Sequence, residues 1–204
     1  MKGAQPSQAR EERRKIVASR SLRLFARMGF SKVSFQDISR ATGVPRTALY
    51  RCYRTKREIF DDAIGRALSE LRTIVNAVLA EKAPAADRLE KVCGIVAERL
   101  FKQRDFLAAI FNFVSSMVTA GEDMSGRIEG FTGGLRRAFR KLLAAGVEDG
   151  SLRRTVDPEA SAELLFALME AAAFNILLNL EKDSRRARRR FREAIAAIRS
   201  GTAE

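Results

Sequence analysis

The stretch SFQDISRATGVPRTALYRCYRTKREIF, residues 34–60, predicts two short helices joined by a tight turn. Ser34 and Asp37 have the spacing of a capping box, in which the serine side chain accepts from a free backbone N–H and the residue three positions later reaches back. Gly43 supplies the turn, because glycine adopts turn conformations without steric cost. Pro45 suits the first position of the next helix, where its missing N–H is not needed.

Longer helices are predicted on both sides of this pair. The preceding one covers residues 9–28, with Val17 and Leu24 on one face and Gly29 as its C-terminal cap. After the pair, TKRE (55–58) is a second capping box that begins a helix ending near residue 82. Two short helices with a supporting helix before them make a helix-turn-helix.

The remainder of the chain also predicts helices, because no run shows the sustained two-residue alternation of a strand. Asp157 followed by Pro158 marks one helix start clearly. The predicted helices of this part cover about residues 86–103, 105–120, 126–147, 158–181 and 185–199. The expected fold is therefore all-α, with a helix-turn-helix domain over residues 1–55 and a second helical domain over residues 56–204.

The positive charge of the chain is concentrated near its N-terminus. The 204 residues have a net charge of +13. Residues 1–60 contain 15 lysines and arginines against 4 aspartates and glutamates, whereas residues 61–204 contain 23 against 21. A basic head on a near-neutral body suggests that the head meets a polyanion such as nucleic acid, although surface arginine alone is common.

The composition argues against an enzyme and against a metal centre. The chain has no histidine and only two cysteines, Cys52 and Cys93, which lack metal-ligand spacing. It also lacks a Gly-rich phosphate loop and a nucleophile–base pair. We therefore expect no catalytic residues, no metal and no cofactor. The polar start of the chain and the interrupted apolar run at 164–180 predict a cytoplasmic protein without a membrane partner.

The second short helix has the features of a base-reading helix. Arg46 and Thr47 lie at its start, the end that enters the major groove of DNA, and arginine is the best partner for guanine. Tyr50 and Tyr53, the only tyrosines of the chain, suit the groove edge, where the ring packs on sugar and the hydroxyl donates to phosphate. Val44 and Leu49 are expected to face inward against Phe35 and Ile38, while Arg51 faces outward toward phosphate. Lys56 begins the next helix and would meet a phosphate there.

Gly29-Phe30 and the stretch 34–60 resemble the N-terminal domain of TetR-family transcriptional regulators, and the resemblance covers about residues 10–60. The matching features are Gly29-Phe30, Ile38-Ser39, Ala41, Gly43-Val44, Leu49-Tyr50, an aromatic residue at Tyr53, Lys56 and Glu58. The resemblance implies a homodimer that binds a palindromic double-stranded DNA operator and responds to a small molecule. It also implies base-edge contacts by Arg46, Thr47 and Ala48, and phosphate contacts by Ser34, Tyr50, Tyr53 and Lys56. Cys52 departs from the family pattern, which often has histidine there. We expect it to be a small packing residue, and a redox-active thiol is the alternative.

Apolar stripes on the later helices suggest a cavity for an apolar or aromatic ligand. The candidate lining residues are Phe106, Ile110, Phe113, Met117, Phe131, Leu135, Phe166, Met169 and Glu170. For any one of them, a place in the ordinary core is the more common alternative.

The helix over 158–181 is rich in alanine and apolar nearly all round, so it must be covered on more than one side. We expect one face to meet the ligand domain and another to meet a second subunit, together with the last helix. The run RRARRRFR (185–192) is most often a solvated helix face, and a second contact with DNA or an acidic membrane is the alternative. The predicted function is a ligand-responsive repressor; the alternative is a constitutive, sequence-nonspecific DNA-binding architectural protein.

Overall fold

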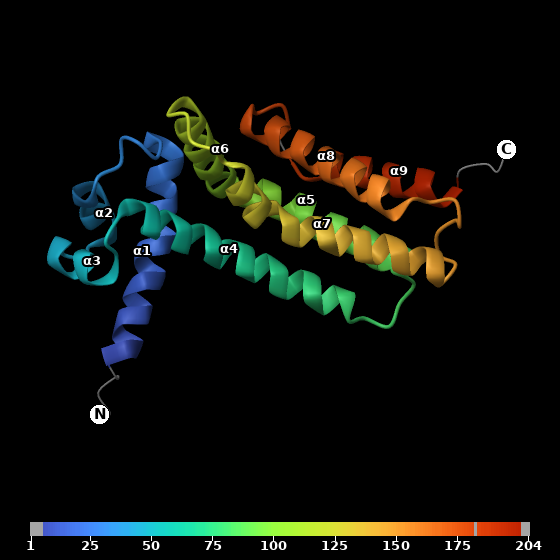
Figure 1. The fold of residues 1–204 in the computed structure, drawn as a ribbon, viewed down its shortest axis with the longest axis horizontal. Helices are drawn as coiled ribbons and strands as arrows, with labels where there is room; N and C mark the ends of the chain where they lie inside the picture. The colour runs from blue at the N-terminus through green and yellow to red at the C-terminus, as the bar shows by residue number, and fades with distance from the viewer. Residues whose placement is uncertain (1–5, 182, 201–204) are drawn as a thin grey trace. The chain divides into compact units, whose positions relative to one another are not determined.

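The structure is a computed structural model that describes residues 6–181 and 183–200, and every regular element in those residues is an α-helix (Figure 1). The all-α fold class is confirmed. The helices are α1 (Pro6–Met28), α2 (Phe35–Thr42), α3 (Arg46–Cys52), α4 (Lys56–Leu79), α5 (Ala85–Lys102), α6 (Arg104–Thr119), α7 (Ser125–Glu148), α8 (Pro158–Leu177) and α9 (Arg185–Ser200).

The helices form two compact units, and the division falls inside α4. The N-terminal unit contains the described residues up to Ser69 together with Asp105–Met124, so it includes α6 apart from its first residue, Arg104. The C-terminal unit contains Glu70–Arg104 and the described residues from Ser125 onward. Because α4 is one continuous helix, it belongs to both units.

The caps that the sequence predicts around the helix-turn-helix are present. Ser34 and Asp37 form the complete capping box of α2, and Gly43 ends that helix in the left-handed conformation with φ 73°. The second box is formed only in part. The Thr55 hydroxyl accepts from the Glu58 N–H at 3.1 Å, but the Glu58 carboxylate accepts from the N–H of Arg54 rather than from that of Thr55.

Four phenylalanine rings form the centre of the N-terminal unit. Phe25, Phe60 and Phe113 are fully buried, and Phe30 is nearly so. Phe113 of α6 stacks on Phe60 with ring centroids 4.3 Å apart and meets Phe30 edge-on at 4.8 Å. α6 is attached to α1 as well, because the Asn112 side-chain amide donates to the carbonyl of Ala26 at 3.0 Å. α6 is therefore an integral part of this unit.

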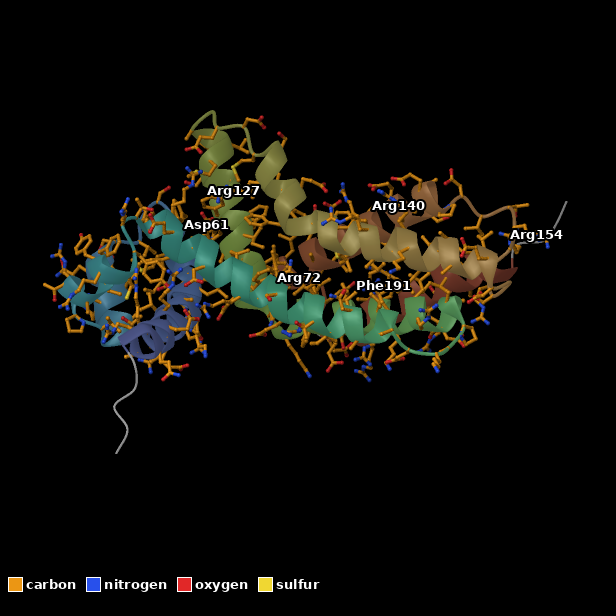
Figure 2. All side chains as sticks on the ribbon, turned by 60° about the horizontal axis from the view of Figure 1, so that its bottom comes forward. Asp61, Arg72, Arg127, Arg140, Arg154 and Phe191 are labelled. Carbon is orange, nitrogen blue, oxygen red and sulfur yellow. The ribbon has the colours of Figure 1, made fainter. Side chains whose placement is uncertain are left out.

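The C-terminal unit is a helical bundle in which α5, α7, α8 and α9 surround one apolar core with the end of α4. Phe191 of α9 is 1% exposed and lies in this core (Figure 2). α8 begins as predicted, with the Asp157 side chain accepting from the N–H groups of Glu159 and Ala160 and with Pro158 in the first turn.

α8 is unusually apolar for a helix with so much exposed surface. By length and composition it could cross a membrane, with a mean hydropathy of 1.5, yet only 28% of that window is buried. Leu164 is 71% exposed and Leu178, just after the helix, is 52% exposed. α8 packs on α5, α7 and α9 with its other side, so these exposed side chains lie on the face turned away from the bundle.

Candidate nucleic-acid interface

α3 separates its apolar and polar residues onto two faces. Leu49 is fully buried and Cys52 is 5% exposed, so this face packs inside the unit, as the sequence predicts for both residues. Arg46 and Thr47 in the first turn are exposed, and Ala48 is half-buried beside them. The start of α3 therefore presents a guanidinium, a hydroxyl and a methyl group to solvent, which are the groups that read base edges.

Tyr50 stands at the outer edge of α3 on an aromatic support. Its side chain is 50% exposed, and its ring stacks on Phe35 of α2 with centroids 4.5 Å apart and an angle of 12° between the planes. Phe35, expected to face inward, is instead half-buried because one side of its ring covers Tyr50. The stacking holds the tyrosine ring in one orientation while leaving its hydroxyl outside.

Two hydroxyl side chains that the sequence interpretation missed hold the turn between α2 and α3. Ser39 donates to the carbonyl of Val44 at 2.8 Å. Thr42 donates to the carbonyl of Ile38 at 2.7 Å and accepts from the N–H of Val44 at 3.2 Å. Serine and threonine side chains commonly form hydrogen bonds with nearby backbone groups in this way. The positions of Ser39 and Thr42 close to Gly43 could therefore have predicted these hydrogen bonds from the sequence.

Ser34 is exposed at the start of α2, where its hydroxyl is part of the cap. The hydroxyl and the backbone N–H of Ser34 both donate to the Asp37 carboxylate, at 2.6 and 3.0 Å, which lowers the pKa of Asp37 below its usual value. A hydroxyl has one proton. A phosphate contact through Ser34 therefore requires that proton to turn away from Asp37.

Tyr53 does not lie where a phosphate contact would require it. Its side chain is 1% exposed, and its hydroxyl donates to Asp62 of α4 at 2.5 Å. Burial, together with this hydrogen bond, raises the pKa of Tyr53 well above its usual value. Asp62 also accepts from Arg14 of α1 at 3.2 Å and from Arg66 at 3.0 Å. Tyr53 therefore joins α1 to α4 inside the unit, and we remove it from the proposed phosphate contacts.

Lys56 is also turned inward. Its ammonium donates to the backbone carbonyls of Phe30, Ser31 and Val33 at 2.8, 2.8 and 3.0 Å. Arg51 and Arg54, by contrast, extend into solvent. The exposed positive charge beside α3 therefore comes from arginine.

The nine candidate ligand residues are divided between the two units. Phe106, Ile110, Phe113 and Met117 belong to α6 in the N-terminal unit, whereas the other five belong to α7 and α8 in the C-terminal unit. Phe113 is committed to the aromatic cluster, and Met117 lies 3.5 Å from the guanidinium of Arg57 through its sulfur. We remove these two residues from the proposed ligand contacts.

The other candidates are mostly core-facing. Phe166 is 1% exposed beneath the guanidinium of Arg136, 4.0 Å from the ring centroid. Leu135 and Met169 pack against the apolar core and Phe131 is half-buried, but Glu170 is exposed. An open cleft of about 440 Å³ lies in this unit, and none of the nine candidates lines it. Its lining residues are Arg153, Thr155, Val156, Asp157, Ser161, Leu164, Leu165, Ala194, Ala197 and Ile198.

The arginine run at the start of α9 is used within the C-terminal unit. Arg188 pairs with Glu98 of α5, and Arg192 pairs with Glu90 of the same helix at 2.9 Å. Arg190 pairs at 2.7 Å with Glu181, whose side chain is 1% exposed. Three of the six arginines therefore have acidic partners outside α9, whereas Arg185, Arg186 and Arg189 are exposed.

The comparisons with known proteins agree with this geometry. Residues 19–63 match the family of bacterial regulatory proteins called the tetR family, and residues 84–200 match the C-terminal domain of BetI-type transcriptional repressors. The chain belongs to the TetR family of transcriptional regulators. As in that family, α2 and α3 are the helix-turn-helix of a DNA-binding domain.

Individual TetR-family relatives cover nearly the whole chain at low identity. The HTH-type transcriptional repressor DhaR of Mycobacterium sp. (strain GP1) is 22% identical over 176 residues, which cover 86% of this chain and 87% of that protein. A TetR transcriptional regulator from Chloroflexus aurantiacus superimposes with a TM-score of 0.76 at 20% identity, over 94% of this chain and 96% of that one. The TetR-family regulator PfmR from Thermus thermophilus gives 0.69 at 21% identity, over 93% and 96%.

Proposed function

We propose that this TetR-family regulator is a repressor that binds a palindromic DNA operator as a homodimer in the cytoplasm and is released by a small apolar or aromatic effector. The exposed polar face of α3 is the observation that carries the proposal. Its buried face fixes the helix in the unit, so that the first turn is free to enter a major groove.

In this proposal Arg46, Thr47 and Ala48 meet base edges. A bidentate arginine–guanine pair discriminates against other bases by about 1–3 kcal/mol. Tyr50 and Arg51 contact phosphates at the groove edge, and Ser34 joins them when its proton turns away from Asp37.

The homodimer rests on the outer face of α8. Exposed apolar residues recur there at alternating spacings of four and three, the pattern by which two helices pack along a seam. They are Ala160, Leu164, Ala167, Ala171, Phe174 and Leu178. The alanines permit close approach of a second helix, and a second copy of α8 offers a complementary surface. α9 lies beside α8 (Figure 1), which supports an interface of four helices, two from each subunit.

The effector response rests on two features of the helices. The half-buried or core-packed Phe131, Leu135 and Met169 supply apolar side chains suited to an apolar ligand. The continuous helix α4 belongs to both units, so a ligand that favours one arrangement of the C-terminal unit can shift the population of DNA-competent dimers.

The test is selection of genomic fragments by the purified protein at near-physiological salt, followed by sequencing. We expect enrichment of one palindromic sequence. We also expect the Arg46→Ala variant to lose its base preference at one base pair of each half-site. Arg72→Ala is the matched control, because Arg72 is an exposed arginine of the C-terminal unit (Figure 2). A sequence-nonspecific architectural protein would instead bind all fragments alike, even at low salt.

A further inference from the structure

We propose that Lys56 is a positioning residue that clamps the loop between α1 and α2, and that it does not bind the DNA backbone. This role of Lys56 rests on the proposed DNA interface. It replaces the phosphate contact expected from the place of Lys56 at the start of α4.

The hydrogen bonds of the Lys56 ammonium are all made inside the protein. A lysine ammonium has three N–H donors and no acceptor. The Lys56 ammonium lies within hydrogen-bond distance of three backbone carbonyls, those of Phe30, Ser31 and Val33, at 2.8, 2.8 and 3.0 Å. Each donor therefore has a partner inside the protein. A phosphate contact would require at least one of these bonds to break.

The charge of Lys56 lies against an aromatic ring. The Lys56 nitrogen lies 4.8 Å from the centroid of the Phe30 ring, a distance at which a cation is attracted to the ring face. Phe30 itself is 7% exposed and packs on Phe60 and Phe113. Desolvation lowers the pKa of Lys56, as expected for an ammonium that is partly withdrawn from water. The ammonium is thus held against the aromatic core of the unit.

The three carbonyls that accept from Lys56 lie in one loop. They belong to the loop after Gly29, which ends α1 with a positive φ of 78°, and before Ser34, which begins α2. Carbonyls in such an irregular loop have no partners in a helix ladder. By collecting three of them at one point, Lys56 ties the start of α4 to the entry of α2. The position of α2, and with it the α2–α3 turn, then depends on this lysine.

This role makes a distinct prediction about salt. A lysine that neutralises a phosphate contributes about 0.9 to the slope of log affinity against log salt concentration on B-DNA, because it releases a counterion. A lysine that only positions the interface contributes nothing to that slope. Its loss weakens binding by the same factor at every salt concentration.

The experiment compares Lys56→Met, Lys56→Arg, Arg51→Met and Lys32→Met in the full chain. Lys32 lies in the same loop and is exposed, so Lys32→Met controls for the loss of one charge there. Thermal unfolding of the free protein and binding to a DNA duplex from about 50 to 200 mM salt are measured for each variant. The ammonium protons of Lys56 are also observed by NMR in the free wild-type protein.

We expect Lys56→Met to lower the Tm by more than about 3 °C while its salt slope stays equal to that of the wild type. Lys56→Arg keeps the charge, but a planar guanidinium cannot direct its donors at three converging carbonyls, so it too should lower the Tm. Lys32→Met should leave the Tm unchanged. The Lys56 ammonium protons should exchange slowly with water before any DNA is added.

A slope reduced by about 0.9 in Lys56→Met overturns the proposal, whatever the Tm does. Fast-exchanging Lys56 ammonium protons, or a Lys56→Arg variant as stable as the wild type, also overturn it. If Arg51→Met leaves the slope unchanged, the proposed DNA face at α3 is wrong, while the Tm and NMR results still decide the role of Lys56.

Discussion

Replacing Phe113 by alanine tests whether α6 is part of the DNA-binding unit or the wall of a ligand cavity. Phe113 is fully buried, with one ring stacked on it at 4.3 Å and another edge-on at 4.8 Å. Truncating a fully packed phenylalanine typically costs about 3–5 kcal/mol, because apolar contact is lost and a cavity remains. With a urea dependence of about 2 kcal/mol per molar, the unfolding midpoint of this unit should fall by roughly 2 M.

The chain provides a selective probe for this measurement. Tyr50 and Tyr53 are its only tyrosines and it has no tryptophan, so intrinsic fluorescence reports the N-terminal unit alone. Far-ultraviolet circular dichroism reports the helices of both units. Urea titrations of Phe113→Ala should therefore show the large shift in the tyrosine signal.

Val118→Ala is the matched control, because Val118 belongs to the same helix and is 59% exposed. Its midpoint should stay within about 0.3 M of the wild type. If Phe113→Ala shifted the tyrosine midpoint by less than about 0.5 M, Phe113 would not be part of the core of this unit, and its removal from the ligand candidates would be refuted.

Three further outcomes are expected. Tyr53→Phe should lower the free energy of unfolding by about 1–2 kcal/mol by removing the hydrogen bond to Asp62; reduced DNA affinity at unchanged stability would show that its hydroxyl reaches phosphate instead. Leu164→Lys should give a monomer mass in light scattering at micromolar concentration, whereas a persisting dimer would exclude the α8 seam. Hydrogen bonds from Ser34 lower the pKa of Asp37 in the folded protein. Between the folded and the unfolded pKa of this carboxyl, the unfolded chain therefore binds more protons than the folded protein. The contribution of these bonds to stability is present above the usual aspartate pKa and is lost as the pH falls through the folded value. Ser34→Ala should therefore destabilise the protein at pH 7, and its difference from the wild type should shrink below about pH 4; a constant difference would contradict this.

The sequence by itself determined the secondary structure and the family because their causes are local. The capping box of Ser34 and Asp37, the left-handed Gly43 and the cap at Asp157 each involve residues within a few positions of one another. The outward face of α3 follows in the same way, since burying Leu49 in a helix leaves Thr47 and Arg51 on the other side. These features were therefore predicted correctly.

The contacts of Tyr53, Lys56 and Phe113 were decided only by the tertiary structure. In the sequence, a tyrosine and a lysine beside a base-reading helix have the right chemistry for phosphate, and a phenylalanine in an apolar stripe has the right chemistry for a ligand. Their actual partners lie far along the chain: Lys56 meets carbonyls 23 to 26 residues earlier, and Phe113 meets a ring of α4. Which of several suitable partners a side chain meets depends on how the helices pack, and pattern and spacing within one helix carry no information about that packing.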